Sequence, residues 1–154
     1  MKKSETLSIE LDPSKTATLK NQSGQTYFIL HDAYLQPSRL EVTGADGSLA
    51  PSVDSRATKK FDNTVRKSAF RRLDAGATLP LFELEAIERE SAFELRWGPF
   101  RIGPLRRGSY TATVVWDSRE THYLDEDTQK KRVQEGAFVG TVRSAAVSFR
   151  LPLH

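Results

Sequence analysis

The stretch that decides the fold reads Leu105-Arg-Arg-Gly108-Ser-Tyr110 and continues as Thr111-Ala-Thr-Val-Val-Trp116. A leucine, a turn glycine and a tyrosine at this spacing precede residues with the period-2 alternation of a half-buried strand. The turn before such a strand leaves main-chain groups unpaired, and a phenol hydroxyl can reach back to one of them while its ring enters the core. The clearest predicted core face consists of Tyr110, Ala112, Val114 and Trp116.

This spacing resembles the tyrosine corner of immunoglobulin-like β-sandwiches. The remainder of the chain also reads as strands separated by turns. Further strands are predicted at 7–11, 16–20, 27–35, from Leu40 to Gly44, and at 69–73, 79–84, 93–97 and 147–151. The predicted fold class is therefore all-β, an immunoglobulin-like antiparallel β-sandwich, with residues 1–154 forming a single domain.

The segment 124–135 breaks this pattern. Acidic residues at 125–127 precede basic residues at 130–132, and Gly136 follows. Acids at the start, bases near the end and a glycine just beyond are typical of a helix. We therefore expect one short helix or ordered loop near residues 124–135.

Composition excludes several classes of protein. The 154 residues include no cysteine, which rules out disulfides, thiolate catalysis and cysteine-ligated zinc. The composition is 38% hydrophobic, and no apolar run has the length of a membrane-spanning helix. A cytoplasmic location is expected for the sequence as written, and a periplasmic or secreted one if a signal peptide has been removed.

Over most of its length from Val42 onward, the chain is similar to the non-catalytic β-sandwich domain of deuterolysin-type (aspzincin) metalloproteases and of stand-alone bacterial relatives. The matching segments are 42–47, 73–76, 105–110 and 140–144. The zinc-binding HExxH of the proteases is missing, so the resemblance implies no protease activity. What it implies is a bacterial scaffold used for binding and folding assistance.

No residue pattern predicts catalysis, a metal site or a cofactor. His31 next to Asp32 is read as a strand-edge histidine, and the acids near His122 are read as a helix start. A calcium loop starting at Asp125 fails because Lys130 and Gly136 occupy the positions that need glycine and glutamate. No nucleophile elbow and no phosphate-binding glycine loop is present. An enzyme, which would need His31 or His122 in a cleft beside a carboxylate, is the minority hypothesis.

Two segments are candidate partner-binding sites. The first is a basic cluster in the stretch with the weakest periodicity, where the alternative is a solvated loop: Arg56, Lys59, Lys60, Arg66, Lys67, Arg71 and Arg72. The second is the glycine- and proline-shaped segment 97–105, with Trp97, Phe100 and Arg101 as contact residues. There the alternative is that Phe100 and Ile102 close the end of the sandwich.

The predicted function is that of a non-catalytic protein-binding module, in its most specific form a protease inhibitor or a pro-region-like partner. A carbohydrate- or surface-binding module is the alternative, and it needs an exposed aromatic platform. A basic-patch adaptor for an anionic partner is a further alternative. Nucleic acid is not expected as the partner, because Phe61 and Phe70 are the only aromatic residues in the basic stretch.

Overall fold

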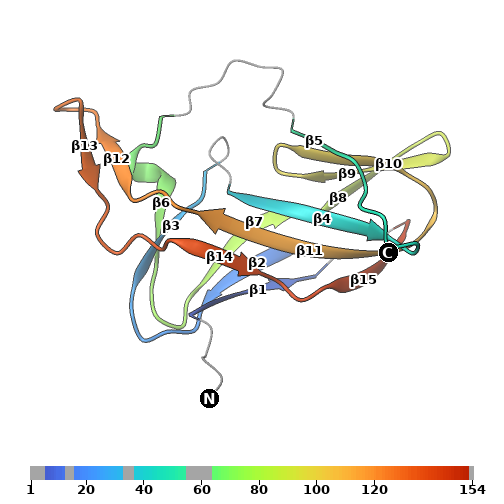
Figure 1. Ribbon diagram of the computed structural model, residues 1–154, viewed down its shortest axis with the longest axis horizontal. Helices are drawn as coiled ribbons and strands as arrows, with labels where there is room; N and C mark the ends of the chain where they lie inside the picture. The colour runs from blue at the N-terminus through green and yellow to red at the C-terminus, as the bar shows by residue number, and fades with distance from the viewer. Residues whose placement is uncertain (1–5, 13–15, 33–36, 55–63, 153–154) are drawn as a thin grey trace.

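The computed structural model describes residues 6–12, 16–32, 37–54 and 64–152 (Figure 1). Within these ranges the regular secondary structure is strand, apart from a single 3-10 turn, η2 (Lys67–Ala69). The strands are β1 (Leu7–Leu11), β2 (Thr16–Asn21), β3 (Tyr27–Leu30), β4 (Ser38–Gly44), β5 (Ser52–Asp54), β6 (Phe70–Leu73), β7 (Thr78–Glu83), β8 (Glu85–Arg89), β9 (Ala92–Trp97), β10 (Phe100–Leu105), β11 (Gly108–Ser118), β12 (His122–Asp125), β13 (Lys130–Val133), β14 (Gly140–Arg143) and β15 (Val147–Leu151). The all-β, sandwich-like fold class predicted from the sequence is confirmed.

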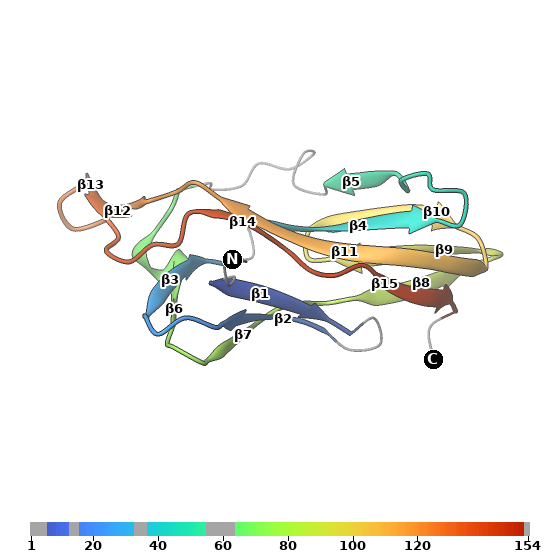
Figure 2. The same ribbon diagram turned by 60° about the horizontal axis from the view of Figure 1, so that its bottom comes forward.

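Two sheets face each other across the core (Figure 2). One has the order β1-β2-β7, and the other is built on β11, which pairs with β4 along one side and with β14 and β15 along the other. All these pairings are antiparallel. The apolar side chains of both sheets belong to one buried cluster, so the core lies between the layers.

A four-stranded sheet, β5-β10-β9-β8, extends the sandwich at the end where β11 begins. Its hairpin β9–β10 turns at Gly98, whose φ of +54° lies in the left-handed region. A Cβ on Gly98 would lie 2.3 Å from the Phe82 ring, so this turn needs glycine for both reasons. The predicted shaped segment 97–105 is thus mostly strand. Ile102 is buried in the core, which agrees with the alternative that it closes the end of the sandwich.

Strand β11 supplies the predicted core face. Ala112, Val114 and Trp116 are buried, and Trp116 Nε1 donates a 3.0 Å hydrogen bond to the Leu30 carbonyl. Trp97 on β9 is also fully buried. The two tryptophans are therefore the largest side chains that are fully buried in the core.

Two sequence-based expectations are wrong. The run 27–35 was expected to give a long central strand, but β3 ends at Leu30 and pairs with β6 in a two-stranded sheet, while 33–36 lie outside the described residues. The segment 124–135 forms neither a helix nor a loop but the hairpin β12–β13. One acid and one base pair across the hairpin: Arg132 Nε lies 2.7 Å from Asp125 Oδ2.

The tyrosine corner is present. Tyr110 Oη donates to the Arg106 carbonyl at 2.8 Å and accepts from the Arg106 N–H at 3.1 Å. The ring is half-buried: it packs against the core cluster and stacks on Phe149 at 5.8 Å between centroids. These contacts fix the turn at 106–107 to the first residues of β11.

We expect Tyr110→Phe to lower the free energy of unfolding by about 1 kcal/mol. Without the hydroxyl, the N–H and carbonyl groups of Arg106 lose their hydrogen bonds to Tyr110 and bind water instead. Urea denaturation of the purified chain measures the change. Tyr27→Phe is the matched control, since its hydroxyl makes only an exposed 3.3 Å bond to the Gln25 side chain. An equal effect of the two substitutions would contradict the corner's structural role.

Candidate functional site

The predicted basic cluster is only partly described. Arg56, Lys59 and Lys60 lie outside the described residues. Of the others, Arg66 pairs with Glu126 at 3.2 Å and Arg72 with Asp74 at 2.8 Å. Lys67 lies 5.9 Å from the centre of the Tyr123 ring, and Arg71 is exposed on β6. Two of the four described basic side chains, Arg66 and Arg72, therefore already have acidic partners.

Hairpin β12–β13 adds charges that sequence reasoning missed to the end of the molecule where this cluster lies, here called the basic end (Figure 1). The Leu124 N–H donates to the Val65 carbonyl at 2.7 Å, which places the hairpin beside η2. Its second strand carries three exposed basic side chains: Lys130, Lys131 and Arg132. These three residues were not counted as site candidates because a short helix or ordered loop was expected here. In a helix, basic side chains near the C-terminal end interact with the helix dipole.

The hydrogen bond from Arg132 holds the pKa of Asp125 below its ordinary value, and the main-chain N–H groups of residues 127 and 128 add to this. A lowered carboxyl pKa means that the charged form stabilises the folded hairpin. This stabilisation is present at neutral pH and is lost as the pH falls below about 3.8 through the folded-state pKa.

Accordingly, Arg132→Gln should raise the pKa of Asp125 toward its ordinary value, as measured by carboxyl-carbon NMR titration. Arg72→Gln is the control, because Arg72 lowers the pKa of Asp74 in the same way on a different strand. If Arg132→Gln leaves the Asp125 titration unchanged, the cross-strand pair does not hold the hairpin in the described geometry.

Trp97, Phe100 and Arg101 do not form one surface. Trp97 lies on the same core-facing side of β9 as Phe93 and Leu95 and meets the Phe82 ring edge-on, at 5.8 Å between ring centres. It is therefore unavailable to a partner, which corrects the prediction. Phe100 is half-buried against the core, whereas Arg101 is exposed and pairs in register with Val53 and Arg96.

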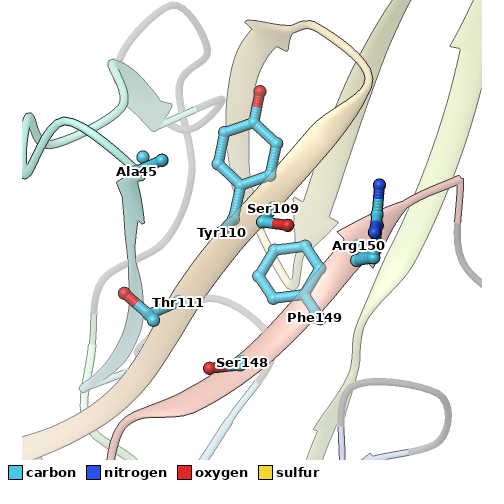
Figure 3. A pocket seen from close by; sticks show the side chains of 8 residues that line it. Ala45, Ser109, Tyr110, Thr111, Ser148, Phe149 and Arg150 are labelled. Carbon is cyan, nitrogen blue, oxygen red and sulfur yellow. The ribbon is translucent and has the colours of Figure 1, made fainter.

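The other end of the molecule holds a hollow of about 400 Å³ beside the tyrosine corner, here called the Tyr110 hollow (Figure 3). Its lining residues are Gly44, Ala45, Ser109, Tyr110, Thr111, Ser148, Phe149 and Arg150. Tyr110 and Phe149 are paired in register on neighbouring strands, and their rings are 29° from parallel. The hollow thus combines two aromatic rings, three hydroxyl-bearing residues and a guanidinium.

Sequence reasoning identified Tyr110 as structural and did not place it in the lining of a hollow. The signal was present in the chain, since Phe149 and Arg150 alternate on the last predicted strand. Only the register Tyr110↔Phe149 and Ser109↔Arg150 shows that this strand meets the corner. Register between strands far apart in sequence is set by the packed core and not by local pattern.

Among the described residues, no group of three or more histidine, aspartate or glutamate side chains is placed to hold a metal ion. His122 Nδ1 lies 2.7 Å from the Thr121 hydroxyl, and the His31 ring lies 5.3 Å from the Phe82 ring. No helix in the described part of the chain is long and apolar enough to cross a membrane. Comparison with known proteins finds no matching family model, no matching curated protein and no matching solved structure.

Proposed function

We propose that this protein is a non-catalytic, immunoglobulin-like binding module that holds a protein partner at the Tyr110 hollow. The observation that carries the proposal is the composition of the hollow. Aromatic rings and arginine are the side chains most enriched where protein interfaces contribute binding energy. The hollow also lies at the end of a rigid sheet, where β-sandwiches generally place their recognition surfaces.

The immunoglobulin-like assignment is supported by the corner at the start of β11 and by the placement of β11 between β4 and β15. The β1-β2-β7 sheet then takes the place of the opposite layer. The resemblance to the non-catalytic domains of deuterolysin-type proteases favours a protease or its precursor as the partner. In that form the module acts as an inhibitor or a pro-region-like companion.

Carbohydrate binding is the weaker alternative. A sugar-binding platform needs exposed aromatic faces, and both tryptophans are 0% exposed. The basic-patch adaptor depends on residues 56–72, of which the described members Arg66 and Arg72 already contact acidic side chains. A protein partner at the Tyr110 hollow requires neither feature.

The test is a comparison of two tryptophan substitutions at opposite ends of the molecule. Ser148→Trp fills the hollow from an exposed position on β15, and Ser68→Trp adds the same bulk to exposed η2. In affinity capture from a lysate of the source organism, followed by mass spectrometry, we expect a stoichiometric protein bound by the unmodified chain and by Ser68→Trp but lost with Ser148→Trp.

If the captured protein is lost with Ser68→Trp and kept with Ser148→Trp, the binding surface lies at the basic end, which would contradict the proposal. Retention on polysaccharide with no protein partner would replace it by the carbohydrate alternative. Circular dichroism and a melting curve for each variant exclude unfolding as the cause, because both substituted serines are exposed.

A further inference from the structure

Strand β15 has a main-chain edge that no described strand pairs. It pairs with β11 along Gly108↔Leu151 to Ala112↔Val147, and no other pairing of β15 exists among the described residues. An unpaired edge offers N–H and C=O groups to another extended chain. The direction in which these groups point follows from the hydrogen bonds of β11.

On β11, Val114 directs its main chain toward the β14–β15 side. Its N–H donates to the Ser144 hydroxyl at 2.9 Å, and its carbonyl accepts from the Ser144 N–H at 2.9 Å. Asp117, an odd-numbered neighbour, donates in the opposite direction to the Pro37 carbonyl. Main-chain direction alternates along a strand, so Tyr110 and Ala112 also face β15.

The opposite residues on β15 follow the same alternation. Phe149 faces Tyr110 and Val147 faces Ala112, so these two use their main-chain groups within the sheet. The N–H and C=O groups of Ser148 and Arg150 therefore point outward. Both residues are exposed, and no described strand other than β11 pairs with β15.

Two hollows are lined in part by β15, and both include Arg150. One is the Tyr110 hollow, and the other measures about 500 Å³ and is lined by Arg107, Gly108, Arg150, Leu151 and Pro152. Arg107 makes an exposed 3.5 Å ion pair with Glu88, a kind of contact that contributes little, and its guanidinium lies 6.0 Å from the centre of the Phe93 ring. Arg150 has no ion pair within the described part of the chain. Guanidinium groups in this setting favour carboxylates.

A second copy of the chain fits this edge poorly. Two β15 strands joined edge to edge would bring two Arg150 side chains onto one short ladder, and like charges across a strand pair are destabilising. A basic residue on an edge strand also protects proteins against self-association. The charge that complements the edge is negative.

We infer that β15 accepts an extended acidic segment of the partner protein as an added strand. The main chain of that segment pairs with Ser148 and Arg150, a carboxylate meets Arg107 and Arg150, and an apolar side chain enters the Tyr110 hollow. This mode of binding gives affinity through the main chain and specificity through alternate side chains. It rests on the proposed function, since it names how the partner is held at the same site.

A random library of short peptides, displayed on phage and selected on the full-length chain, tests the inference. We expect enriched peptides to alternate acidic and apolar residues. In synthetic copies, N-methylation at every second residue should abolish binding, whereas N-methylation at the intervening residues should leave it unchanged. That alternation is the signature of strand pairing, because only alternate N–H groups face β15.

On the protein side, Arg150→Glu should weaken the binding of the enriched peptide about tenfold or more, as measured by calorimetry. Arg71→Glu is the matched control: it makes the same charge change at an exposed strand arginine at the other end. No enriched peptide, tolerance of N-methylation at every position, or equal effects of the two substitutions would overturn strand addition. The tryptophan comparison above is independent of these outcomes and decides the proposed function separately.

Discussion

Strand β11 forms main-chain hydrogen bonds along both of its edges, and buried side chains lie on both of its faces. Over its eleven residues it pairs with β4 along one edge and with β15 and then β14 along the other. Its even-numbered side chains from Ala112 to Trp116 enter the core, while Val115, although buried, belongs to the outer face beside Arg39 and Arg143. The Tyr110 hydroxyl fixes the start of the strand by binding the preceding turn.

The position of the proposed binding surface is a consequence of that constraint. Because β11 begins at the corner, the register that buries Phe149 also sets it against the Tyr110 ring and sets Arg150 opposite Ser109. Because the main chain of β11 alternates, the residues of β15 that face away are the two with exposed side chains. The Tyr110 hollow and the open edge therefore share the β15 residues Ser148 and Arg150.

The alternation of apolar and polar residues was sufficient to predict a strand that has one buried face. Leu7, Ile9 and Leu11 alternate with polar residues, and β1 spans these same residues. The order of charges was ambiguous at 124–135. Acids followed by bases match a helix dipole, but they also match the cross-strand pair Asp125–Arg132 that the structure contains. The sequence-based prediction also failed at Trp97. Its residue type suggested an interface, but the ring is buried on the same face of β9 as Phe93 and Leu95.

The candidate site was the least predictable part, because it depends on which distant strands become neighbours. Tyr110 was recognised as structural and the last strand was recognised as a strand, yet no local feature joins position 110 to position 149. That pairing is decided by long-range packing of the core.

Residue-resolved amide hydrogen exchange along β15 tests the central claim most directly, because it reports which N–H groups are engaged in the sheet. The described geometry predicts strong protection at Val147, Phe149 and Leu151 and fast exchange at Ser148 and Arg150. Equal protection along all five residues would show that the outer edge is already occupied within the isolated chain, and would contradict both the open edge and the binding mode built on it.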